Sequence, residues 1–217
     1  MTRVLTCIAT LVALLSGCGG GESEPPSEPL GTGGLARAFD LARSEGRVDM
    51  RLKATTTRPG RGTRPQFEAE GEIDLAASAG EATLGVAGFA GAEIPDMSVS
   101  WTAAEVKANG KTLARKAARV SGGQLGMLPD EAQAMAELVA DAEGVRERAN
   151  GSWTFTVPAA AAIRRGIPPQ PQSGENWSGE AQADADGRLR RVVVRLATPA
   201  LGTTIPAGTA ALELKLG

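Results

Sequence analysis

The sequence contains no histidine and no tyrosine, and its 217 residues include only two cysteines, Cys7 and Cys18. The missing histidine excludes a serine–histidine–aspartate or cysteine–histidine nucleophile and any histidine-ligated zinc site. The pair Gly122-Gly123 lacks the lysine and hydroxyl residue that complete a phosphate-binding loop. No clustered carboxylates occupy apolar positions where burial would raise a pKa. We therefore expect no catalytic residue, no metal and no cofactor, and a protein that is not an enzyme.

The chain also lacks a strong excess of charge of either sign. Lysine and arginine number 23 against 25 aspartates and glutamates, so the basic footprint of a nucleic-acid-binding protein is absent. Beyond Cys18 the chain has no cysteine, which excludes a disulfide, a thiol-based metal site and a thiol redox site in whatever domain follows.

The N-terminus has the layout of a secretory signal peptide. Arg3 precedes the apolar run Val4–Leu15, which is too short for a bilayer span of about 20 apolar residues. The run ends in Leu15-Ser16-Gly17-Cys18, which resembles a bacterial lipobox. In lipoproteins with this motif the signal is removed before the cysteine, which then carries acyl chains. The alternatives are an ordinary signal peptide and a single membrane span. The pattern favours residues 1–17 as a lipoprotein signal peptide and Cys18 as the lipid attachment site that anchors the protein to the membrane.

The chain after the cysteine divides into two parts. Residues 18–34 are glycine, proline, serine and glutamate with almost nothing to bury, which is typical of a flexible tether. Residues 35–217 form a single domain of ordinary size, long enough for a hydrophobic core.

Hydrophobic periodicity predicts three helices in this domain. Leu35–Glu45 has an apolar face at helical spacing. A second helix begins at Pro129-Asp130 and ends near Gly144, because proline favours the first helical position and glycine the end. Pro158–Gly166 is expected to be a third, short helix.

Elsewhere the apolar residues alternate with polar ones, which predicts strands. Asn109-Gly110 and Asp186-Gly187 are expected hairpin turns, and Thr57–Pro65 and Ile167–Glu175 are expected loops. The predicted strands are 48–54, 67–75, 82–86, 97–101, 106–108, 111–113, 153–157, 177–185, 189–196 and 210–216.

These strands define the fold class. Each is apolar on one face only, which indicates an antiparallel sheet with one solvated face. A sheet of about nine to ten strands curls, and helices must cover its apolar face. We expect an α+β fold: a strongly curved antiparallel sheet, a half-barrel, with helices on the concave face.

Two segments carry a resemblance to a known family. Gly151–Pro158 and Asp184–Val192 are similar to a late strand and to the Asp-Gly-Arg-Leu hairpin of actinobacterial lipoproteins of the LppX/LprG type, whose half-barrel is related to the lipoprotein carrier LolA. The order of elements agrees over residues 35–217. The resemblance implies an exported protein on the outer face of the cell membrane, with an apolar cavity that in relatives can hold acylated lipids.

Two functions remain open. The first is binding or transport of an acyl lipid or glycolipid, with a membrane transporter as a candidate partner; palmitate, with about 16 carbons, would gain about 0.8 kcal/mol per buried CH₂. The second is a protein-interaction or sensor module with a packed core and an exposed apolar patch near Trp177. For any single inward residue, simple packing in the core is the more common role. The candidate cavity-lining residues are Phe39, Met50, Leu52, Phe67, Ala69, Ile73, Leu84, Val86, Met97, Val99, Trp101, Met135, Leu138, Val139, Trp153 and Phe155.

Overall fold

The computed structural model describes residues 33–86, 95–114, 130–148, 150–165, 176–198, 200 and 207–217. The predicted signal peptide, Cys18 and most of the tether lie outside this part of the chain, as does the whole predicted loop Ile167–Glu175. The helices and strands are α1 (Gly33–Arg43), β1 (Arg47–Arg58), β2 (Gly62–Asp74), β3 (Ala79–Val86), β4 (Met97–Trp101), β5 (Glu105–Ala108), β6 (Lys111–Ala114), α3 (Asp130–Leu138), the 3₁₀ helix η1 (Val139–Asp141), β7 (Glu143–Arg148), β8 (Ser152–Val157), α4 (Ala159–Arg165), β9 (Trp177–Ala183), β10 (Leu189–Thr198) and β11 (Gly208–Leu216).

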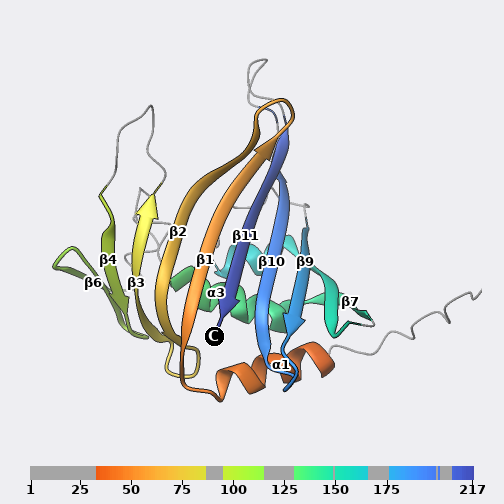
Figure 1. The fold of residues 1–217 in the computed structure, drawn as a ribbon, viewed down its shortest axis with the longest axis horizontal. Coiled ribbons are helices and arrows are strands. Elements are labelled where there is room, and N and C mark those ends of the chain that lie inside the picture. Colours follow the sequence, from red (N-terminus) through yellow and green to blue (C-terminus); the bar gives the residue numbers. More distant parts are fainter. Residues whose placement is uncertain are drawn as a thin grey trace, which may run out of the picture.

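The strands form one antiparallel sheet in the order β6-β5-β4-β3-β2-β1-β11-β10-β9-β8-β7. Every neighbouring pair is consecutive in the chain except β1 and β11, which lie side by side at the middle of the sheet (Figure 1). Met50 of β1 stands opposite Leu216 of β11. The last strand of the domain therefore pairs with its first. The predicted antiparallel architecture is confirmed.

The two faces of the sheet differ completely in character. Because side chains alternate along a strand, residues in one row across the sheet share a face. The row Leu216, Met50, Gly71, Ala82, Val99 and Ala108 is apolar. The next row, Lys215, Arg51, Glu70, Thr83 and Ser98, is charged or polar. We call these the inner and the outer face.

The helices cover the inner face. α3 lies behind the strands in the view of Figure 1, and α1 runs across their lower end. α1 buries Leu35, Ala38, Phe39 and Ala42, whose spacing puts them on one side of a helix, as predicted. These residues belong to the same apolar cluster as the inner face of the sheet. Helices on the concave face of a curved sheet were the expected arrangement, and it is confirmed.

Strand β7 was not predicted. The sequence indicated a helix that lasts to Gly144, but α3 ends at Leu138 and continues only as the single turn η1. Val145 is the one buried residue of β7, so the strand has no alternating pattern to recognise. Gly144 has a φ of 60° beside an irregularity in the pairing with β8, a conformation that glycine adopts without strain. The count rises to eleven strands for this reason.

The predicted loop Thr57–Pro65 is also mostly strand. Thr57 pairs with Thr209 and with Thr63, so β1 and β2 extend to a short turn around Gly60. A register shift between Ala54 and Thr55 accommodates Pro65, as expected for a proline at a bulge. Here hydrogen bonds to two neighbouring strands outweigh a local composition typical of loops.

The two predicted hairpin turns are confirmed. Asn109 and Gly110 have φ values of 48° and 76°, the pair of positive angles that a tight hairpin requires, and they join β5 to β6. Gly187, with a φ of 81°, lies in the turn between β9 and β10.

Candidate functional site

The inner face is the candidate site because it is apolar from one side of the sheet to the other. Val106 of β5, Ile73 of β2, Leu52 of β1, Val194 of β10 and Phe155 of β8 all lie on it, and all are buried. Together with the helices these strands form one contiguous cluster of buried residues.

The structure brings the predicted lining residues together. Of the sixteen candidates, fourteen are buried in this cluster, from Phe39 of α1 to Phe155 of β8. Met97 is half-buried and packs against the cluster, while the side chain of Val86 lies outside the described residues. The predicted residues therefore form one contiguous apolar face, as both a lipid site and an ordinary core require.

The inner-face residues of β9, β10 and β11 were missing from the predicted set. The additional residues come from the C-terminal strands. β11 alternates as clearly as the N-terminal strands, so its signal was present in the sequence, whereas β10 carries the consecutive buried residues Val192–Val194 and a register shift after Leu189. They include Val157, Trp177, Leu189, Val192, Val194, Leu196, Leu212, Leu214 and Leu216. Any occupant of the inner face would therefore lie against β8–β11 as well as β1–β4.

The helices over this face carry mostly small side chains. α3 buries Ala132, Ala134 and Ala136 beside its larger Met135 and Leu138. α4 buries Ala159, Ala161 and Ala162. Alanine adds little contact area, so the larger side chains of the interior come mainly from the strands.

Two aromatic rings lie directly against glycines of neighbouring strands. A Cβ on Gly80 would overlap the indole of Trp101, and a Cβ on Gly179 would overlap the ring of Phe155. Both glycines pair with the strand that carries the ring. The missing side chains thus give these rings room to lie close to the sheet.

A polar network crosses the otherwise apolar interior at α3. Gln133 is 4% exposed, and its Nε2 donates to the carbonyl of Leu75 at 3.2 Å and to Glu137 Oε1 at 2.7 Å. Arg165 of α4 then donates to Glu137 and, at 2.6 Å, to Asp141 Oδ2. This network ties α3 to the turn after β2 on one side and to α4 on the other.

Three buried side-chain atoms of the described residues have no hydrogen-bond partner. They are Gln133 Oε1, Trp101 Nε1 and Trp177 Nε1. A buried polar atom without a partner costs about 1–3 kcal/mol, so such atoms are rare in folded proteins. Trp177 is fully buried, so it is not the exposed apolar residue that was expected to mark a protein-binding patch.

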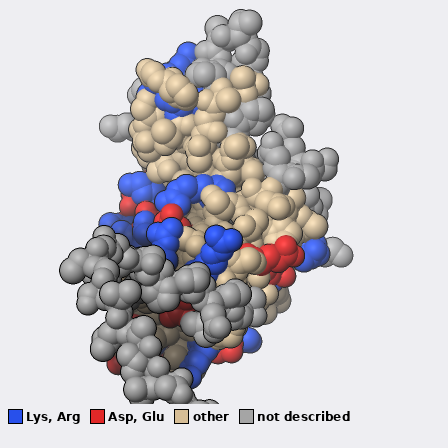
Figure 2. All heavy atoms as spheres, turned by 90° about the vertical axis from the view of Figure 1, so that its right-hand side faces the viewer, with Lys and Arg blue, Asp and Glu red and all other residues tan. Residues whose placement is uncertain are grey.

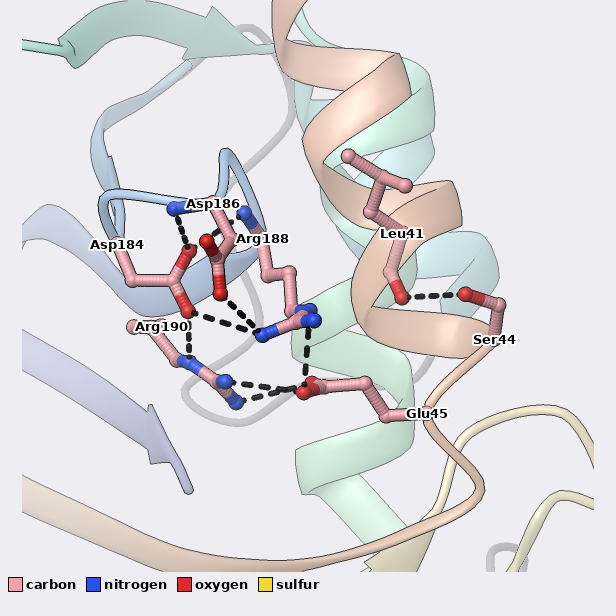
Figure 3. Close-up of polar contacts among 7 residues, drawn as sticks. All are labelled: Leu41, Ser44, Glu45, Asp184, Asp186, Arg188 and Arg190. Carbon is pink, nitrogen blue, oxygen red and sulfur yellow. Dashed lines mark hydrogen bonds and ion pairs between the residues drawn. The ribbon is translucent and has the colours of Figure 1, made fainter.

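α1 is fastened to the β9–β10 hairpin by ion pairs, which Figure 3 shows. We call Glu45, Asp184, Asp186, Arg188 and Arg190 the Glu45 cluster. Arg190 donates from Nη1 and Nη2 to the two oxygens of Glu45, each at 2.9 Å, and from Nε to Asp184 Oδ2 at 2.8 Å. Arg188 Nε lies 3.4 Å from Glu45 Oε1. The hairpin that carries the family resemblance therefore has a structural role: it holds the C-terminal end of α1.

The Glu45 cluster shifts the pKa of two of its members. The backbone N–H of Arg188 donates to Asp184 Oδ1 at 2.9 Å and is the largest influence that lowers the pKa of this carboxyl, with Arg190 adding to it. Partial burial acts to lower the pKa of Arg190, but its bonds to Glu45 and Asp184 outweigh that effect and raise the pKa above its ordinary value. Both groups are therefore held in their charged forms.

The outer face carries opposite charges on adjacent strands. Arg51 bonds to Glu70, Arg191 bonds to Glu213 at 2.6 Å, and Arg195 lies 3.1 Å from Glu180. From the side that carries β7, acidic and basic side chains lie next to one another across the middle of the molecule (Figure 2). Such exposed pairs contribute about 0–1 kcal/mol each.

Two open hollows, of about 570 and 580 Å³, lie on this outer face. The first is lined by residues such as Glu72, Glu81, Thr83 and Ser100, and the second by residues beside the C-terminus. Both therefore lie on the opposite side of the sheet from the predicted lipid site.

Within the described residues, no group of carboxylates could hold a metal ion. In the same part of the chain, no helix is long and apolar enough to cross a membrane.

Comparison with known proteins identifies the fold. No protein-family model matches the chain, and no curated protein matches it in sequence. Among solved structures, LprF from Mycobacterium bovis aligns with a TM-score of 0.50 and 12% identity over 88% of this chain and 93% of its own. The Mycobacterium tuberculosis lipoprotein LppX aligns with a TM-score of 0.42 and 12% identity over 86% and 92% of the two chains. A LolA superfamily protein from Nitrosomonas europaea aligns with a TM-score of 0.36 and 9% identity over 84% and 90%. At these identities the likeness concerns the fold alone: the described residues adopt a curved antiparallel sheet with helices on one face, similar to the fold of LprF.

Proposed function

We propose that the protein is a membrane-anchored envelope lipoprotein that binds or carries acyl lipids between the inner face of its sheet and its helices. The observation that carries the proposal is the continuous apolar inner face. Eleven strands at about 4.8 Å spacing give a face about 48 Å wide along its curve. The helices α1, α3 and α4, with 11, 9 and 7 residues, are only about 16, 14 and 10 Å long. Among the described residues, these three helices are much smaller than the face that they cover.

The chemistry of this face suits hydrocarbon. A chain of 16 carbons gains about 0.8 kcal/mol for each CH₂ that leaves water, so it needs no charged anchor. The inner side chains are nearly all buried against one another. An acyl chain therefore requires the helices to move off the sheet, and the alanines of α3 and α4 make that separation less costly than large interlocked side chains would.

The position in the cell follows from the N-terminus. Lipid attached at Cys18 would hold the domain on the outer face of the cell membrane, with residues 19–34 as the tether. A membrane transporter is a candidate partner for loading or release. Catalysis is not part of the proposal, since the sequence lacks the residues for it.

The test is solvent extraction and mass spectrometry of the chain carrying Cys18→Ser, purified without added lipid. Wild-type inner-face residues should give bound acyl lipid. Val99→Trp, on the inner face of β4, should lose most of it, because the indole occupies the space that the chain needs. Ser98→Trp is the matched control: it adds the same indole one residue away on the outer face, and lipid should remain.

Thermal melts of the same proteins separate a lipid site from a solid core. The inner side chains pack against one another without lipid, so Val99→Trp should cost the lipid-free protein about 1–3 kcal/mol whether or not the face binds lipid. At a lipid site, wild-type protein that carries lipid should melt at a higher temperature than the same protein after delipidation, because a ligand stabilises the form that binds it. No lipid on the wild-type protein, together with no rise in Tm when acyl lipid is added, would refute the proposal and leave the protein-interaction module as the better account.

A further inference from the structure

We propose that the corner formed by Gln133 and Trp101 is a hydrogen-bonding subsite for the polar end of a hydroxylated acyl lipid, such as a partly acylated glycerol or sugar. The inference rests on the proposed lipid-binding function and specifies which lipids that function concerns. It follows from two polar atoms that the fold buries without a protein partner.

Gln133 has one free hydrogen-bonding atom, and the network determines which one. Its Nε2 donates to both the Leu75 carbonyl and Glu137, and a flipped amide would place its oxygen against these two acceptors. The side chain is therefore held with Oε1 free to accept. Beyond Gln133, Glu137 is bound by Arg165, which also binds Asp141. This network of described residues is complete except at that one buried oxygen.

Trp101 brings a donor to the same end of the sheet. Its indole lies over Gly80, which pairs with Ile73 of β2, two residues before the carbonyl that Gln133 binds. Trp101 is 2% exposed, and its Nε1–H has no acceptor among the described residues. One buried acceptor and one buried donor thus lie at the same end of the sheet, against apolar surroundings.

These two atoms define the chemistry of the occupant. Gln133 Oε1 needs a hydrogen from the ligand, which a hydrocarbon and a fully esterified lipid both lack. A hydroxyl supplies that hydrogen, and an oxygen of the same polar end accepts from Trp101. A lipid with its hydroxyl capped leaves a buried acceptor unpaired, and sites of this kind reject such analogues.

The experiment compares two probes that differ only at the hydroxyl. The chain carrying Cys18→Ser is equilibrated with vesicles that contain 1,2-dipalmitoylglycerol or its 3-acetyl ester, and bound lipid is measured by mass spectrometry. The wild-type site should prefer the free hydroxyl by about fivefold to tenfold, the usual worth of one hydrogen bond. Gln133→Met keeps the shape of the side chain and should reduce the preference to about one, while still binding both probes.

Two further variants keep the test decisive. Trp101→Phe removes the indole N–H donor and should weaken binding of dipalmitoylglycerol severalfold. Trp177→Phe is the matched control, because it removes the third unpartnered atom at another part of the sheet, and it should leave the preference unchanged. If Gln133→Met does not fold, the wild-type preference and Trp101→Phe still decide.

The outcomes separate this inference from the function on which it rests. No binding of either probe would refute lipid binding itself. Equal binding of the two probes by the wild-type site would refute the subsite alone. A preference that survives in Gln133→Met would also refute it.

Discussion

Replacement of Arg190 by methionine should detach the C-terminal end of α1 from the β9–β10 hairpin. The substitution keeps much of the side-chain volume but removes three hydrogen bonds of 2.8–2.9 Å to Glu45 and Asp184. Fully buried bonds to charged groups are worth about 1.5–3 kcal/mol each, whereas exposed ion pairs are worth about 0–1 kcal/mol.

The Glu45 cluster lies between these limits. The side chains of Arg190 and Glu45 are 26% and 19% exposed, and Arg188 still faces Glu45 after the substitution. We therefore expect a total loss of about 2 kcal/mol in the free energy of unfolding. For a domain of this size that corresponds to a decrease in Tm of about 4–8 °C.

Thermal and urea unfolding at pH 7 measure this effect. Arg51→Met is the matched control, since it removes an arginine that pairs with Glu68 and Glu70 on the exposed outer face, and it should cost clearly less than Arg190→Met. A double-mutant cycle with Glu45→Gln isolates the energy of the pair. Equal effects of Arg190→Met and Arg51→Met would refute the reasoning, because burial at the hairpin would then add nothing.

Three further predictions concern the hairpin, the sheet and the anchor. Because the pKa of Asp184 is lowered in the folded protein, its carboxylate stabilises the fold above the unfolded pKa of about 3.9, and this contribution is lost as pH falls through the folded pKa. Asp184→Asn should thus destabilise the protein at pH 7 and approach wild type near pH 2 in chemical denaturation; a pH-independent difference would contradict this. Gly179→Ala should lower the free energy of unfolding by about 1–3 kcal/mol, because the added Cβ overlaps the ring of Phe155, and Phe155→Leu in the same chain should restore part of that loss. An unchanged stability of Gly179→Ala would show instead that the ring moves aside. Cys18→Ser should move the protein from the membrane fraction to the soluble fraction, and a protein that stays in the membrane would show that the anchor lies elsewhere.

Much of the fold could be predicted because alternation is a local property. The run from Phe67 to Leu75 places apolar and acidic residues on opposite faces, and the structure keeps them there. The turn at Asn109-Gly110 was equally visible, since its positive φ angles suit few other residue pairs. The alternation thus indicated a one-sided antiparallel sheet, and most of the predicted lining residues are buried together on its inner face.

Tertiary structure decided what depends on contacts between distant residues. Strand β7 has one buried residue and exists because β8 pairs with it, and the ends of β1 and β2 exist because Thr57 pairs on both sides. Glu45 and Arg190 are 145 residues apart, so neither identifies the other in the sequence. The partner of Gln133 is also distant in the sequence. Its position on an apolar helix gave no sign that the Leu75 carbonyl, 58 residues earlier, would accept a hydrogen bond from its amide nitrogen and that its oxygen would stay unpaired. Periodicity determines which face a residue occupies, but only the folded chain determines which partner it meets there.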